Sequence, residues 1–172
     1  MSKLFRTTLW ILSGIGLIAF FFQTLSTFLI SPLMGLLSLL IAAILVALVI
    51  YLLQRSPMWA RPARLWATLA FLWGGGVAVA LALISAGPVM QLAIGSGWVD
   101  SMMSWSGAYP EEISKATGVI FVLMSFRQLN RPWHGWMVGA VVGLGFEACE
   151  NILYGAMGAT TVSYTHLRAH ET

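Results

Sequence analysis

The chain has 172 residues, of which 59% are hydrophobic and only 9% are charged, whereas about a quarter of the residues in a soluble domain are charged. This composition excludes an ordinary soluble domain of this size. The net charge of +3 comes from lysines and arginines that are spread beside apolar segments, so we expect a membrane protein and no nucleic-acid partner.

The first part of the chain is long enough for two membrane crossings. No charged residue occurs between Arg6 and Arg55, a stretch that would measure about 72 Å as a helix, against about 30 Å for the hydrocarbon core. Ser31 and Pro32 divide it into predicted helices over residues 7–30 and 33–53. The first apolar run exceeds an ordinary signal-peptide core and lacks a small-x-small cleavage site, so we expect a retained span.

Three further helices are predicted over residues 65–90, 110–126 and 132–158. The predicted fold is therefore all-α, a polytopic membrane protein with about five transmembrane helices. If the helices alternate in direction, seven basic residues share one side: Lys3, Arg6, Arg55, Arg61, Arg64, Arg127 and Arg131. The positive-inside rule then places the N-terminus in the cytoplasm.

The segment from Gln91 to Tyr109 is expected to lie outside the membrane. Its Trp98, Trp105, Met102 and Met103 suit an interfacial segment with aromatic rings at headgroup level. A simple connector is the plainer interpretation of the same segment.

Acidic residues converge at one depth of the last two predicted helices. The uncharged stretch between Lys115 and Arg127 spans only about 16 Å, so the fourth helix must include Lys115 to cross the membrane. Counted from the basic turn between Arg127 and Arg131, Glu111, Glu147 and Glu150 lie about 24 to 29 Å up their helices. Charges at this depth should face the bundle and be paired or hydrated, and Lys115 is the available cation.

Small residues predict how these two helices pack. Gly135, Gly139 and Gly143 form a small-xxx-small ridge, which allows close approach of helix backbones, and Glu150 continues the same side. On the fourth helix Glu111, Gly118 and Ser125 recur every seven residues. We expect the two helices to meet along these faces.

The charged cluster has several interpretations. It is either a structural ion cluster with hydrated helix-end charges, which is the interpretation favoured for Glu112 alone, or a site of chemistry or ion transport, for which such strain is typical. A proton- or ion-coupled transporter and a non-catalytic membrane scaffold are the alternatives to a protease. The chain shows no inverted repeat of the kind found in carriers, which favours a peptidase with Glu111 as the water-activating base.

Two motifs then resemble a known family. Glu111-Glu112-Ile113-Ser114-Lys115, followed by Gly145-Phe146 and Glu150-Asn151, resembles the Glu-Glu-x-x-Lys and Gly-Phe-x-x-x-Glu-Asn motifs of the PrsW family of intramembrane proteases, within residues 108–155. The resemblance implies a polytopic endopeptidase, related to the CAAX prenyl endopeptidases, in a bacterial-type cytoplasmic membrane. It implies cleavage of membrane-anchored regulators, such as anti-sigma factors, near the outer face.

Carried over by position, the resemblance implies these catalytic residues: Glu111, Glu112, Lys115, Glu150 and Asn151. It also allows a metal, with zinc as the candidate, for which the acidic candidates are Glu111, Glu147 and Glu150. Cys149, the only cysteine, has no histidine or basic partner within a turn and is not expected to be a nucleophile.

The chain departs from the family pattern after the second motif. The family carries histidines on later helices, and no apolar helix follows Gly158, so we expect a transmembrane domain over residues 1–161 that is truncated and inactive as it stands. Residues 162–172 are expected to be a polar, non-native and mobile tail. His134 lies near the inner end, about 24 Å from Glu150 along the helix, and His166 and His170 are not assigned to a metal.

Overall fold

The computed structural model describes residues 3–169, with side chains up to residue 155. This part of the chain is helical throughout and contains no strand. Its elements are α1 (Lys3–Ile30), α2 (Pro32–Arg55), α3 (Arg64–Leu72), η1 (Trp73–Ala78), α4 (Val79–Gly95), η2 (Val99–Ser101), α5 (Met102–Ser125) and α6 (Pro132–Ala169). The predicted all-α fold is confirmed.

The first two helices meet at the predicted break. Ser31 adopts an extended conformation with ψ at 96°, and Pro32 occupies the first turn of α2, where its missing N–H costs no hydrogen bond. Within the described residues, four helical stretches are long and apolar enough to cross a membrane: Lys3–Ile30, Pro32–Arg55, Arg64–Gly95 and Pro132–Gly155. The expected further crossing corresponds to α5, which is set apart from these four by its charged residues Glu111, Glu112 and Lys115.

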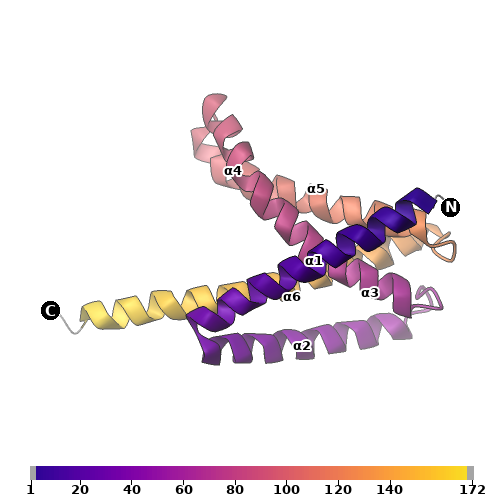
Figure 1. Cartoon of the computed structure of the whole chain (residues 1–172), viewed down its shortest axis with the longest axis horizontal. Helices are drawn as coiled ribbons and strands as arrows, with labels where there is room; N and C mark the ends of the chain where they lie inside the picture. The colour runs from indigo at the N-terminus through magenta and orange to yellow at the C-terminus, as the bar shows by residue number, and fades with distance from the viewer. Residues whose placement is uncertain (1–2, 170–172) are drawn as a thin grey trace.

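The third span runs as α3, η1 and α4 without interruption, and η1 is a π-helical segment. Its Gly74, Gly75 and Gly76 are all buried, because neighbouring backbones approach them directly. A Cβ on Gly74 would strike the Val142 carbonyl of α6, and a Cβ on Gly76 would strike the backbone of Gly16 on α1. Three spans therefore cross at this point, as Figure 1 shows where α1, α6 and the junction of α3 with α4 overlap.

The connection from α4 to α5 corrects the prediction for residues 91–109. Most of this segment is helical, since α4 continues to Gly95 and α5 begins at Met102, with Pro110 inside the helix rather than at its start. The turn between them uses Gly97, whose φ of +79° suits glycine. Trp105 stacks on Tyr109 with ring centroids 4.3 Å apart, a contact between residues one helical turn apart that extends α5 beyond the proline.

The last helix is also longer than predicted. α6 continues from Pro132 to Ala169, where residues 132–158 were expected, and so the helix includes most of the segment that was expected to be a mobile tail. Residues 170–172 of that segment lie outside the described residues.

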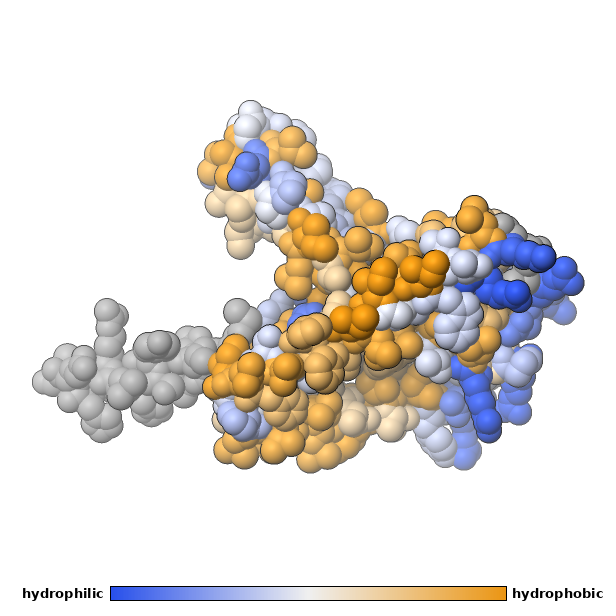
Figure 2. All heavy atoms as spheres, viewed as in Figure 1, coloured by the Kyte–Doolittle hydropathy of each residue, from blue (hydrophilic) through white to orange (hydrophobic). Residues whose placement is uncertain are grey.

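The basic residues gather at one end of the molecule, as predicted. Figure 1 shows the N-terminus, the α2–α3 loop and the α5–α6 loop together at this end, and Figure 2 shows hydrophilic side chains concentrated there beside a largely hydrophobic body. One hollow brings Lys3 and Arg6 together with Arg127, and Gln128 donates a hydrogen bond to the Pro62 carbonyl. We call this the basic end. The α4–α5 connection forms the tip of an arm that projects away from it (Figure 1).

Candidate active site

The first acidic motif lies on the polar turn of α5 that follows Pro110. Lys115 Nζ lies 2.5 Å from Glu112 Oε1, and the lysine side chain is 18% exposed whereas that of Glu112 is 71% exposed. The same ammonium group lies 4.4 Å from the ring centroid of Phe146 on α6, a cation–π geometry. Lys115 is therefore held between α5 and α6, and Glu112 anchors it from the surface.

Glu111 is half-buried, whereas its neighbour Glu112 is exposed. A Cβ added at Gly107 would lie 4.0 Å from Glu111 Oε1, so the carboxylate folds back over the preceding turn of α5, as long helical side chains do. Lys115 pairs with Glu112, and this is the one ion pair in the part of the chain with described side chains. Glu111 thus keeps its carboxylate available.

The second motif, on α6, brings Glu150 towards the first. Glu150 is half-buried and accepts a hydrogen bond of 3.3 Å from the Tyr154 hydroxyl. The charges of Glu111, Glu147 and Lys115 all act on its carboxylate. Lys115 also contacts Phe146, one turn before Glu150 on α6, so the two motifs face each other across these helices.

The remaining predicted site residues lie on the periphery of this cluster. Glu147 and Asn151 are exposed on α6.

Cys149 is a free thiol with 1% exposure in the main hydrophobic core, which matches the expectation of a structural cysteine. No water or substrate reaches a thiol that is packed in this way.

Trp73 supports the site and was missed in the sequence. Its indole Nε1 donates a hydrogen bond of 3.0 Å to the carbonyl oxygen of Ser114. Ser114 lies between Glu111 and Lys115 along α5. Its ring fills the space beside Gly118, where a Cβ would collide with it. The only signal in the sequence was its place next to three consecutive glycines, which are unusual inside an apolar helix.

The glycine ridge of α6 faces α5 only in part. Cβ atoms on Gly135 and Gly139 would each lie 3.8 Å from a side chain of α5, but one on Gly143 would meet nothing within 4 Å. The close backbone approach occurs instead at Gly145, whose Cβ would strike the Phe71 carbonyl. Gly118 of α5 likewise faces Trp73 and not α6. The expectation that these glycines form one common α5–α6 contact was therefore wrong at Gly143 and Gly118.

The one histidine whose side chain is described does not join the acids. His134 is 6% exposed at the basic end, where its Nδ1 accepts a hydrogen bond of 3.1 Å from the Arg131 backbone N–H. It lies about 24 Å from Glu150 along α6, as expected. The side chain of His166 and all of His170 lie outside the described residues.

A metal ion requires more than this cluster offers. Among the described side chains, no group of three His, Cys, Asp or Glu residues is arranged to hold a metal, whereas a catalytic zinc has three protein ligands. The cluster offers only carboxylate oxygens as ligands, and the cation of Lys115 lies among them. These described residues alone do not fit a zinc site.

The sequence matches one family model. The family described as PrsW family intramembrane metalloprotease matches residues 61–169, which is more than half of the chain. The match extends beyond the two acidic motifs to α3, η1 and α4, the span that carries Trp73. No curated protein and no solved structure matches the chain.

Proposed function

Because the chain belongs to the PrsW family of intramembrane metalloproteases, we propose that it is an endopeptidase that cuts a membrane-anchored protein near the outer face of the membrane. The observation that carries this proposal is the approach of the two motifs across α5 and α6, where Lys115 lies over the ring of Phe146, one turn before Glu150. The approach occurs in the half of the bundle away from the basic end, since Glu111 lies about 24 Å along α5 from Arg127.

Glu111 is the proposed general base. A base must reach the water whose proton it removes, and a half-buried carboxylate with no ion-pair partner can do so. Glu150, held by the Tyr154 hydroxyl, is the proposed second carboxylate, which shares the attacking water or its proton with Glu111. Hydrolysis then proceeds by attack of the activated water on the peptide carbonyl, with the proton passing through a carboxylate to the leaving amine.

Lys115 is the proposed electrostatic support for this step. Its charge offsets the repulsion between the acids and is suited to stabilise the negative charge that grows during attack on a carbonyl. Glu112 holds Lys115 in place through the ion pair. Asn151 supplies an amide group at the rim of the cluster, suited to donate to the substrate backbone.

The proposed substrate and orientation in the membrane rest on the depth of the acidic cluster and on the basic end. A site in the outer half favours cleavage of a single-span regulator such as an anti-sigma factor, in a bacterial-type cytoplasmic membrane with the basic end in the cytoplasm. Membrane burial of the reacting groups strengthens their electrostatic interactions.

The test is the release of a reporter from a library of single-span proteins that carry it on the outer side, co-expressed with this protein. Glu111→Gln keeps size and hydrogen bonding but removes the base, so release should fall at least about 100-fold. Asp100→Asn, which removes an acid of the α4–α5 connection outside the cluster, is the matched control and should leave release unchanged. Equal release by Glu111→Gln and the unaltered protein would contradict the assignment of the base.

A further inference from the structure

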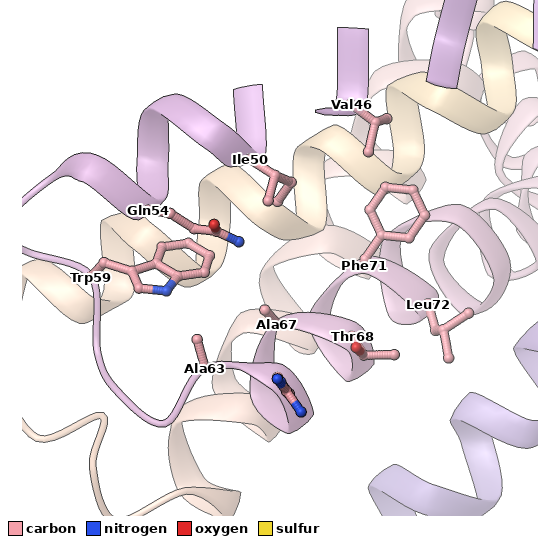
Figure 3. Close-up of a pocket in the computed structure, with 10 residues that line it drawn as sticks. Val46, Ile50, Gln54, Trp59, Ala63, Ala67, Thr68, Phe71 and Leu72 are labelled. Carbon is pink, nitrogen blue, oxygen red and sulfur yellow. The ribbon is translucent and has the colours of Figure 1, made fainter. Parts of the chain in front are cut away.

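A second hollow of the molecule lies far from the acids, between α2 and α3 near the basic end. α2 and α3 both pack on α6 and leave a cavity of about 330 Å³ between them. Figure 3 shows its side chains, with Gln54 and Trp59 at one end and Val46, Phe71 and Leu72 at the other. The cavity thus has a polar mouth and an apolar interior.

The apolar interior extends along α2 away from the basic end. Gln54 lies one residue before the end of α2, and Val46 lies about 12 Å deeper along the helix axis. The lining between them includes Ile50, Ala67 and Phe71. The volume is near the lower end of the roughly 300 to 1,000 Å³ that is typical of small-molecule sites.

The mouth of the cavity carries positive charge with no acidic partner. Arg64 lines the cavity and Arg61 lines an adjoining hollow of about 670 Å³ that shares Gln54, Trp59 and Arg64 with it. Both arginines are exposed, and neither forms an ion pair in the described part of the chain. The acids with described side chains all lie on α5, α6 or the α4–α5 connection.

We propose that this cavity binds one acyl chain of an anionic phospholipid whose phosphate lies against Arg61 and Arg64. Guanidinium groups hold phosphate oxygens in paired hydrogen bonds, and basic pockets between transmembrane helices on the cytoplasmic side suit acidic headgroups. The apolar interior begins next to these arginines, so one lipid can place its headgroup at the mouth and its acyl chain in the interior. The site is independent of the acidic cluster and of the proposed protease reaction.

The experiment is a titration of the purified full chain with phosphatidylglycerol or phosphatidylcholine, with bound lipids counted by native mass spectrometry. One phosphatidylglycerol should remain bound with about tenfold or greater preference over phosphatidylcholine, since each arginine contributes about 1 kcal/mol to binding of an acidic headgroup. The pair Arg61→Gln and Arg64→Gln should abolish this preference. The pair Arg127→Gln and Arg131→Gln removes equal charge from the same end outside the cavity and should keep it.

Filling the cavity distinguishes a site that holds an acyl chain from a charged surface that attracts only the headgroup. Ala67→Phe places a ring in the interior and should reduce the binding of phosphatidylglycerol at least about tenfold, and Thr68→Phe provides the same test at an exposed position if the first variant fails to fold. Equal effects of the two arginine pairs, equal retention of both lipids, or binding unchanged by both phenylalanine variants would overturn the proposal. So would a dimer or a bound partner helix that covers α2 and α3 and excludes phosphatidylglycerol.

Discussion

Trp73 joins the third span to the acidic helix through its hydrogen bond to Ser114, 3.0 Å from indole Nε1 to the carbonyl oxygen. The indole is 1% exposed and stacks on Phe121 of α5 with ring centroids 5.3 Å apart. Glu111 and Lys115 occupy the turn that contains Ser114. Because η1 also packs on α6, this side chain helps to set the position of the acids relative to α6.

Trp73→Phe should lower both stability and cleavage. The change keeps an aromatic ring beside Phe121 but removes the hydrogen bond, at a cost of about 1 kcal/mol in the free energy of unfolding. Trp66→Phe is the matched control, since Trp66 Nε1 donates an equal bond of 3.0 Å to the Ala60 carbonyl near the basic end. Thermal unfolding in detergent should show similar losses for both variants, and reporter release should fall only for Trp73→Phe. A parallel fall in both would mean that Trp73 acts through stability alone.

Gly118→Ala should destabilise the bundle, because the new methyl group collides with the Trp73 ring. Overpacking of this kind costs about 1 to 3 kcal/mol. Gly143→Ala, at a position with no atom within 4 Å of the new Cβ, should be neutral or stabilise α6 by up to about 1 kcal/mol. The comparison of unfolding midpoints tests both, and equal effects would contradict the packing described for Gly118.

Lys115→Met should lower stability by about 1 kcal/mol, although it retains an apolar stem over Phe146. The ion pair with the exposed Glu112 contributes at most about 1 kcal/mol, and the cation–π contact about 0.5 to 2 kcal/mol. Glu112→Gln removes only the ion pair and should cost less. A double-mutant cycle of the two changes measures the coupling between them, and a coupling near zero would show that the ion pair adds nothing.

Periodicity and turn residues were sufficient to locate most helices. The Ser31 and Pro32 break predicted a helix boundary because the residue before a proline avoids the helical region, and the structure places the boundary there. Pro110 gave the opposite result. Proline is common in the first turn of a helix, so it predicted a start, yet α5 begins at Met102 and packs along α4. Tertiary packing there outweighs the loss of one backbone hydrogen bond.

The approach of the acids was predictable because depth along a helix follows from residue number alone. Glu111 and Glu150 were placed at one height by counting from the basic turn, and the structure places Lys115, one turn from Glu111, over Phe146, one turn from Glu150. The orientation of each helix about its own axis was harder to derive. Gly118 and Gly143 both suit close packing, and only the arrangement of all spans decides that Gly118 faces Trp73 and that Gly143 faces no neighbour.

The orientation of the bundle in the membrane is the last prediction. The basic end combines Lys3 and Arg6 with both loops that carry arginines, so the positive-inside rule places it in the cytoplasm. Pro57→Cys and Gly95→Cys, each in a Cys149→Ala background, introduce thiols at exposed positions of opposite ends. A membrane-impermeant maleimide should label Gly95→Cys in intact cells and Pro57→Cys only after the membrane is opened. Labelling of Pro57→Cys alone in intact cells would reverse the orientation and move the acids to the cytoplasmic half, where cleavage near the outer face is excluded.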